Sequence, residues 1–157
     1  MANQLDIFRQ NGTSYVLSAY SSKETLATYK PENLKECITL VKQVAYVLDN
    51  IHKLGYLYLD TKPDNVLVVD GYQKQIQLFD FDSLLSIQEV RKISKLSCSN
   101  IRLSYSKGFS PIELQTSKIK HLGAHTDVYS VGALLFYLLF GYTPTAPDCE
   151  TDIVFDF

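Results

Sequence analysis

The chain has 157 residues, of which 46% are hydrophobic and 20% are charged, and its formal net charge is -2. This length fits one domain or part of one, and the composition is that of a globular protein rather than a disordered chain. The near-neutral charge supplies no strongly basic surface, so we expect no nucleic-acid partner.

A β-hairpin is predicted near the amino terminus. Leu5 to Arg9 and Ser14 to Tyr20 form two strand candidates, and Asn11-Gly12 between them is a strong signal for a two-residue hairpin turn.

A long amphipathic helix is predicted next. Pro31 suits its first turn and Gly55 suits its end. Apolar residues recur at helical spacing, and we expect them to face the core. These residues are Leu34, Ile38, Val41, Ala45, Leu48 and Ile51.

Polar side chains gather directly after this helix, in the run Tyr58-Leu59-Asp60-Thr61-Lys62-Pro63-Asp64-Asn65. An isolated aspartate with an asparagine five residues later is common in turns, where both side chains bond to the backbone. The interpretation of this run therefore depends on its neighbours in the chain.

A second hairpin comes directly after the polar run. Val66 to Val69 and Gln75 to Phe79 are strand candidates, and Asp70-Gly71 signals a turn between them. This hairpin would bring Asp80, the first residue of Asp80-Phe81-Asp82, back beside Asn65.

These residues together predict a phosphotransfer site, because such chemistry needs positioning and charge neutralisation more than covalent help. Asp60 would accept or orient the proton of an attacking hydroxyl, and Lys62 would place a positive charge beside the moving phosphate. Asn65 and Asp80 would bind magnesium, which prefers carboxylate and amide oxygens.

The order of the motifs resembles that of the protein kinase family. The polar run and the Asp80-Phe81-Asp82 cluster resemble its catalytic loop and its metal-binding motif. Three further segments fit the same order: Tyr15 to Tyr20 as the last N-lobe strand and hinge, with Ser18 as the gatekeeper, Gly108 to Glu113 as the end of the activation segment, and Asp127 to Gly132 as the start of the central C-lobe helix.

The resemblance implies an α+β fold, specifically a partial protein-kinase-like fold with a mostly helical C-lobe, the last N-lobe strands and the hinge. Residues 1–20 would be the N-lobe remnant and residues 21–157 an incomplete C-lobe. It also implies ATP and Mg2+ as cofactors. Ala19, Tyr20 and Ser21 would line the adenine edge, and Leu67 would lie beneath the adenine ring.

Three residues depart from the family pattern. Leu59 replaces the usual arginine before the catalytic aspartate, so a phosphate on the activation segment would lack its ordinary partner. Asp82 replaces a glycine, which removes backbone freedom and adds a carboxylate near the metal. Tyr58 stands where histidine is commoner, and we expect it to be tolerated.

Other family features are absent from these 157 residues. There is no glycine-rich phosphate loop, and the strand lysine and helix glutamate of active kinases have no counterpart, so we expect the chain alone to be inactive or weak. The arginine that usually pairs with Glu113 is not encoded either. Val128 to Tyr142 is too short to span a bilayer and predicts a helix buried in protein, here with exposed apolar surface.

The activation segment, residues 82–108, is rich in serine. It is either a segment that shapes a peptide-substrate site and accepts phosphate, or a solvated surface loop. The candidate phosphoacceptors are Ser94, Ser97, Ser99, Ser104 and Ser106.

Cys37, Cys98 and Cys149 are odd in number and widely spaced, which favours reduced structural thiols over disulfides or a zinc site. The chain opens with no charged leader followed by an apolar core, so no secretory signal is predicted and we expect a cytoplasmic protein.

Three functions remain open. The first is an ATP- and Mg2+-dependent kinase of serine or threonine in protein substrates, a class favoured by Lys62. The second is a non-catalytic kinase-like module that binds a protein or a nucleotide, or a gene fragment. The third is a small-molecule kinase of the same fold, which Lys62 and the Pro111 to Glu113 closure disfavour.

Overall fold

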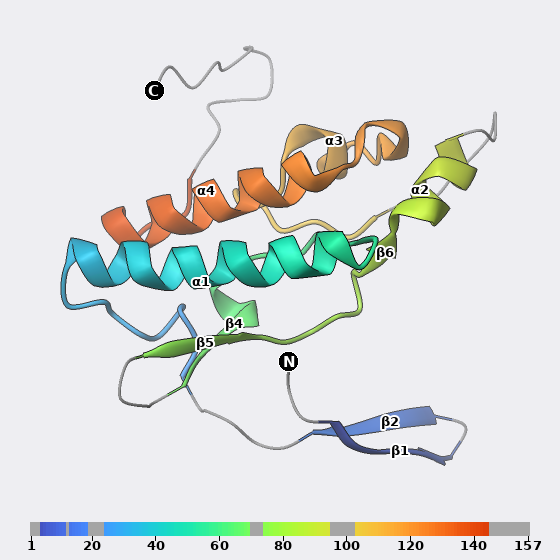
Figure 1. Ribbon diagram of the computed structural model, residues 1–157, viewed down its shortest axis with the longest axis horizontal. Helices are drawn as coiled ribbons and strands as arrows, with labels where there is room; N and C mark the ends of the chain where they lie inside the picture. Colours follow the sequence, from blue (N-terminus) through green and yellow to red (C-terminus); the bar gives the residue numbers. More distant parts are fainter. Residues whose placement is uncertain (1–3, 12, 19–23, 70–73, 95–102, 145–157) are drawn as a thin grey trace.

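The computed structural model describes residues 4–11, 13–18, 24–69, 74–94 and 103–144. Within them, helices α1 (Leu34–Lys53) and α4 (Ala124–Phe140) lie side by side along their lengths. Short strands and turns lie beside this helix pair, in the α+β arrangement that was predicted (Figure 1).

The amino-terminal hairpin is confirmed. Strands β1 (Gln4–Gln10) and β2 (Thr13–Ser18) pair in antiparallel fashion, and Figure 1 shows them apart from α1 and α4. Asn11 in the turn has a φ of 52°, a left-handed conformation that asparagine tolerates better than most residues. The last two residues predicted for the second strand, 19 and 20, lie outside the described residues.

Helix α1 begins and ends at polar and glycine signals. The Asn33 side chain caps its start by accepting a hydrogen bond from the Glu36 N–H at 3.0 Å. Gly55 has a φ of 86° just after the final cap residue, which confirms the predicted end. The placement of Pro31 in the first turn is wrong, because the Asn33 cap puts the first turn after it.

The buried face of α1 is rotated from the predicted stripe. Leu34 and Ile38 are 59% and 39% exposed, and Ala45 is also exposed, so these three core assignments are wrong. Sequence spacing shows how wide the apolar arc is but not which edge meets a neighbour, and α4 and the returning strand pack on the other edge. The buried side chains of α1, three of them predicted, are Cys37, Leu40, Val41, Val44, Leu48 and Ile51.

Two short strand pairs hold the segments after α1. The predicted second hairpin is confirmed as β4 (Val66–Val69) paired antiparallel with β5 (Gln75–Leu78), while its turn residues 70 and 71 lie outside the described residues. A second pair joins β3 (Tyr56–Leu57) to β6 (Leu85–Ser86). The two pairs place the segments after β3 and after β5 next to each other.

The main core lies between the two long helices and the β4–β5 hairpin. Its members are buried apolar side chains, all within a few per cent of full burial: Leu26, Leu40, Val44, Leu48, Ile51, Tyr58, Val66, Val68, Leu78 and Leu134. Cys37 packs at its edge, and burial raises the pKa of the Cys37 thiol above its usual value. The other two cysteines lie outside the described residues.

Helix α2 (Ile87–Ser94) lies within the activation segment and was not predicted. Its start has the Ser-x-x-Glu pattern of a capping box: the Glu89 carboxylate accepts from the Ser86 N–H at 3.2 Å, and the Ser86 hydroxyl accepts from the Gln88 N–H at 3.1 Å. A serine with a glutamate three residues later is the sequence signal that would have revealed this helix.

Helix α4 is only partly covered by the rest of the chain. It comes after the short helices α3 (Ile112–Gln115) and η2 (Ile119–His121). Leu134 is fully buried, whereas Val128 and Phe140 are 64% and 58% exposed, so the predicted exposed apolar surface is confirmed. No helix in the described part of the chain has the length and hydrophobicity needed to cross a membrane.

The same substitution at two positions of α4 tests this burial. We expect Leu134→Ala to lower the free energy of unfolding by about 2 to 5 kcal/mol, because it opens a cavity in the core. Leu139→Ala, at a site that is 42% exposed, should cost less than about 1 kcal/mol. Urea unfolding of both variants measures the difference, and equal losses would contradict the assignment of the two faces.

Candidate functional site

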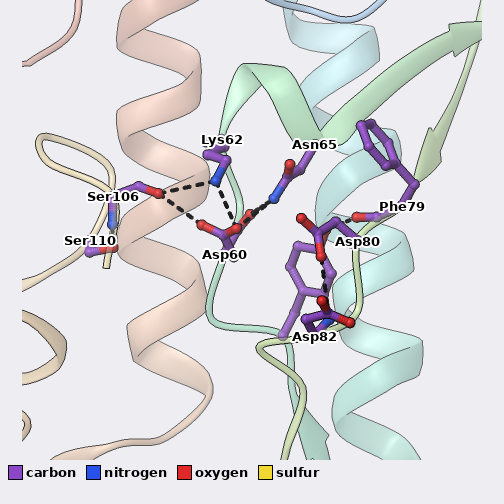
Figure 2. A network of polar contacts seen from close by, with 9 residues as sticks. Asp60, Lys62, Asn65, Phe79, Asp80, Asp82, Ser106 and Ser110 are labelled. Carbon is purple, nitrogen blue, oxygen red and sulfur yellow. Dashed lines mark hydrogen bonds and ion pairs between the residues drawn. The ribbon is translucent and has the colours of Figure 1, made fainter. Parts of the chain in front are cut away.

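Asp60 is the centre of a polar network formed by residues distant in the sequence (Figure 2). Its Oδ2 accepts hydrogen bonds from Lys62 Nζ at 2.8 Å and from Asn65 Nδ2 at 2.7 Å. Its Oδ1 accepts the hydroxyl hydrogen of Ser106 at 2.8 Å. Three of the predicted site residues, Asp60, Lys62 and Asn65, are therefore in direct contact.

The short helix η1 (Pro63–Asn65) sets the orientation of Asn65. Pro63 occupies its first position, where its fixed φ suits a helical turn, and the Asn65 N–H donates to the Lys62 carbonyl at 3.0 Å. The Asn65 side chain is buried, and Nδ2 makes both of its hydrogen bonds, to Oδ2 and to the backbone carbonyl of Asp60. Its amide oxygen points away from Asp60 (Figure 2).

The β4–β5 hairpin brings Asp80 to this amide. The Phe79 N–H donates to the Asn65 carbonyl at 3.2 Å, so the next residue, Asp80, lies beside Asn65 as predicted (Figure 2). Asp80 is exposed and has a φ of 60°, in the left-handed region. This φ turns the chain sharply at the end of the hairpin.

The expected backbone penalty at Asp82 is not found. Asp80, not Asp82, has the positive φ, so a glycine is not needed at position 82. The Asp82 N–H instead approaches Asp80 Oδ1 at 3.4 Å. The second part of the expectation holds, since Asp82 does add an exposed carboxylate beside Asp80 (Figure 2).

The oxygens of Asn65 and Asp80 form a donor set that fits Mg2+, a hard cation that is usually bound by one or two carboxylates together with phosphate oxygens and water. In the described ranges of the chain, no three His, Cys, Asp or Glu side chains gather at metal-binding distance. A cation here would therefore have few protein ligands, which suits magnesium on a nucleotide better than a closed structural metal site.

Asp127, near the start of α4, anchors the backbone at the beginning of the polar run. Its carboxylate is fully buried and accepts hydrogen bonds from the N–H groups of Tyr58 at 3.0 Å and Leu59 at 2.7 Å. His52 Nε2 lies 2.7 Å from the same carboxylate. These contacts support Leu59 in a left-handed conformation with φ of 66°, which is costly for a residue with a branched side chain.

Tyr58 links the two loops that carry the site. Its ring is fully buried and its hydroxyl donates to the Phe79 carbonyl, in the residue before Asp80. Burial first, and then the nearby carboxylates of Asp60, Asp80 and Asp127, raise the pKa of the Tyr58 hydroxyl well above its usual value. The tyrosine at this position is thus accommodated as a neutral hydrogen-bond donor.

Ser106 was considered only as a phosphoacceptor, yet its hydroxyl bonds to the carboxylate at the centre of the site. Lys62 Nζ lies 3.4 Å from the same hydroxyl, and the Ser106 N–H donates to Ser110 Oγ at 2.9 Å. Sequence spacing carried no signal for this contact, because Ser106 lies 46 residues from Asp60. Asp127 was quoted only as part of a motif, and its structural role was likewise not predicted.

The segment that ends the activation segment is anchored to α4. Thr126 Oγ1 donates to Glu113 Oε1 at 3.2 Å, and His125 Nε2 lies 3.8 Å from the same oxygen. Gly108 has a φ of 82°, and a Cβ there would lie 2.4 Å from Thr143 Cγ2, so only glycine fits. Glu113 therefore has partners within the described chain other than an arginine.

The structure describes only some of the remaining predicted residues. Leu67 is half-buried in β4 and forms an isolated bridge with Thr25. The exposed Ser94 donates its hydroxyl to the Val90 carbonyl, and Ser104 is exposed. Ala19, Tyr20, Ser21, Ser97 and Ser99 lie outside the described residues.

Two hollows lie near the described surface, and neither contains Asp60, Asn65 or Asp80. The larger, of about 370 Å³, is lined by residues at the end of α1 and the start of α2. The smaller, of about 230 Å³, lies beside Leu59.

Comparisons with known proteins identify the family of this chain. The protein kinase domain family model matches residues 2–155. A probable serine/threonine-protein kinase of Clostridium perfringens is 26% identical over 157 residues, which cover 98% of this chain and 22% of that protein.

Two animal proteins match shorter stretches. Serine/threonine-protein kinase MRCK gamma of Homo sapiens is 33% identical over 105 residues, which cover 65% of this chain and 6% of that protein. Smooth-muscle myosin light chain kinase of Gallus gallus is 25% identical over 118 residues, 75% of this chain and 6% of that protein. The chain thus spans between 6% and 22% of the length of these relatives.

Removing the Asp127 carboxylate tests its role in holding the loop. We expect Asp127→Ala to lower the free energy of unfolding by roughly 2 to 6 kcal/mol, because two buried N–H groups lose their acceptor at about 1 to 3 kcal/mol each. Urea unfolding provides the measurement. Asp49→Ala, which removes an exposed carboxylate paired with Lys53, is the control and should leave the unfolding midpoint unchanged.

The Tyr58 hydroxyl makes stability depend on alkaline pH. Its pKa is raised in the folded state, so its contribution is complete below the unfolded pKa of about 10, begins to fall as the pH rises above that value and is fully lost only at the higher folded pKa. We expect the stability advantage of the wild type over Tyr58→Phe to shrink between about pH 9 and pH 11. Urea unfolding at both pH values measures it, and a constant difference would contradict the assigned burial.

Proposed function

The chain belongs to the protein kinase family, and from this premise we propose that it carries the ATP- and Mg2+-dependent phosphotransfer site of a serine/threonine protein kinase. The observation that carries the proposal is the convergence of Lys62, Asn65 and Ser106 on the carboxylate of Asp60, with Asp80 alongside. The serine/threonine class is supported by the names of the relatives and by Lys62.

In this proposal Asp60 receives the proton of the attacking hydroxyl. Its Oδ1 already accepts a hydroxyl hydrogen, that of Ser106, at 2.8 Å, which supports a role in accepting one from a substrate serine or threonine in its place. The hydrogen bonds from Lys62 and Asn65 to Oδ2 fix the orientation of the carboxylate. Asp60 is the catalytic base of the site.

Lys62 supplies positive charge where the transferred phosphate would pass. Its ammonium lies 2.8 Å from Asp60 and is only partly exposed, so it remains close to the reacting oxygens. Magnesium, when bound by Asn65 and Asp80, would neutralise charge on the nucleotide phosphates. Both effects lower the cost of bringing a hydroxyl to an anionic phosphate.

The nucleotide base would lie against the segment before α1 and against β4. Ala19, Tyr20 and Ser21 would line its edge, and Leu67 would lie beneath it. In the same proposal residues 1–20 are an N-lobe remnant with hinge and residues 21–157 an incomplete C-lobe. Because no glycine-rich loop occurs among these 157 residues, we expect negligible turnover by the chain alone and weak nucleotide binding.

A second candidate is a non-catalytic kinase-like module that binds a protein or a nucleotide. The observations that favour it are the missing phosphate loop and the additional carboxylate of Asp82, which is exposed beside Asp80. When the ligand of such a module is a protein, the two candidates differ in whether the site holds a magnesium nucleotide.

Titration of the chain with ATP, in the presence and absence of Mg2+, separates them. We expect binding that needs Mg2+ and that weakens by about tenfold or more in Asp80→Asn, because one metal ligand loses its charge. Isothermal titration calorimetry or fluorescence anisotropy of a labelled nucleotide gives the affinity.

Asp64→Asn is the matched control, since Asp64 is an exposed carboxylate in the same loop. It should leave the affinity unchanged. Binding without dependence on Mg2+, or an equal loss in both variants, would overturn the proposed magnesium site and favour the second candidate.

A further inference from the structure

Gln77, in β5, has a side-chain nitrogen that is buried without a partner. Within the part of the chain that the structure describes, its Nε2 is covered and has no hydrogen-bond partner. Buried polar groups in proteins are nearly always paired, because the hydrogen bonds to water that are lost on burial have to be replaced. An amide donor that stays unpaired in the free chain is therefore a candidate for contact with a ligand.

The strand pairing places Gln77 in a row with Leu67 and Thr25. Leu67 lies opposite Gln77 in the β4–β5 hairpin, and on its other side it forms an isolated antiparallel bridge with Thr25. Residues directly opposite each other on antiparallel strands carry their side chains on the same face of the sheet. The Gln77 side chain thus lies on the same face as that of Leu67.

This face is turned away from the main core. Side chains alternate between the two faces along a strand, and the neighbours Val66, Val68 and Leu78 belong to the main core, with Ile76 packed against it. The core face is the one turned to α1 (Figure 1). The row of Leu67 and Gln77 is therefore on the outer side, where the base of the proposed nucleotide would rest.

The backbone that carries Gln77 is held at both edges of β5. One edge pairs with β4. At the other edge the Gln43 side chain of α1 takes the place of a strand: its Oε1 accepts from the Ile76 N–H at 3.1 Å, and its Nε2 donates to the Lys74 carbonyl at 3.0 Å. The strand is thus fixed, and only the side chain of Gln77 has to turn to make a new contact.

The distance from the proposed magnesium site suits a nucleoside. Leu67 is two residues from Asn65 along the chain, and Gln77 is three residues from Asp80. At about 3.3 Å per residue these separations are roughly 7 Å and 10 Å. The ribose and the α-phosphate separate the base of a nucleotide from the phosphates that share a metal. A nucleotide with its magnesium at Asn65 and Asp80 would therefore bring its nucleoside part to the row.

We propose that the Gln77 side chain turns outward and donates a hydrogen bond to an acceptor on the nucleoside part of the bound nucleotide. Gln77 is half-buried and its side chain has several rotatable bonds, so the amide can reach a ligand without movement of β5. A donor that lacks a partner in the free chain gains one on binding, and the contact strengthens the complex. The contact rests on the proposed function, because that function places the nucleotide over Leu67.

Titrations of Gln77→Met with three ligands test this contact. Methionine keeps the length and flexibility of the side chain and removes the donor. We expect the affinities for Mg2+-ATP and for adenosine to fall by about fivefold or more, and the affinity for Mg2+-tripolyphosphate to stay as in the wild type. Chemical-shift titration by NMR measures all three. Gln75→Met is the matched control, since Gln75 is an exposed glutamine on the same face of β5, and it should bind each ligand as the wild type does.

The stability of the ligand-free chain is a second readout. Gln77→Met removes a donor that has no partner, so we expect the midpoint of urea unfolding to be no lower than that of the wild type. A lower midpoint would mean that the donor is paired in the free protein, directly or through a buried water, and would overturn the proposal. Gln77→Glu keeps the shape of the side chain and decides the outcome if the methionine variant does not fold. It should weaken Mg2+-ATP binding at least as much.

Asp80→Asn should give the reverse pattern, with weaker binding of Mg2+-tripolyphosphate and unchanged binding of adenosine. Equal affinity of Gln77→Met and the wild type for adenosine would overturn the Gln77 contact and leave the magnesium site standing. Unchanged tripolyphosphate binding in Asp80→Asn would instead overturn the magnesium site, so the two failures are distinguishable. Absence of adenosine binding by the wild type would overturn both the position of the base and the Gln77 contact.

Discussion

A single buried carboxylate organises the loop that carries Asp60. Asp127 sits near the start of α4, fully buried, and its charge is offset by two backbone N–H groups and by His52. A buried ion without such partners would be strongly destabilising, so the carboxylate and the loop require each other. The position of Asp60, one residue beyond these contacts, is set by this arrangement.

Because Asp127 binds backbone groups, the side chains of Tyr58 and Leu59 are available for other contacts. They belong to different clusters: Tyr58 packs in the main core and bonds to the Phe79 carbonyl, and Leu59 packs in a second cluster that includes Val90 of α2. The first contact connects the loop of Asp60 to the loop of Asp80. The second connects it to the activation segment, so both loops that flank the proposed site are tied to adjacent residues.

Several features were readable from local sequence because their causes are local. The Asn11-Gly12 turn, the β4–β5 hairpin and the end of α1 at Gly55 each depend on residues within a few positions of one another. Helix α2 was equally local, and the Ser86 to Glu89 capping box was overlooked because the stretch was interpreted as a serine-rich loop.

The errors arose where long-range packing decides. The apolar arc of α1 is wide, and only the position of α4 determined that Leu34, Ile38 and Ala45 would be exposed. Asp82 was expected to restrict the backbone in place of a glycine, but the left-handed turn falls on Asp80, since the hairpin contact from Phe79 to Asn65 fixes where the chain reverses.

For the candidate site, the sequence by itself determined the residue types, their order and the family, because the chemistry of phosphate and magnesium restricts which side chains serve and the motifs occur in one order. Tertiary structure alone decided that Ser106 meets Asp60 across 46 positions, that Asp127 supports the loop, and that Leu59 closes an apolar cluster. The physical reason is that hydrogen bonding and apolar burial act between neighbours in space, and separation along the chain does not reveal which residues become such neighbours.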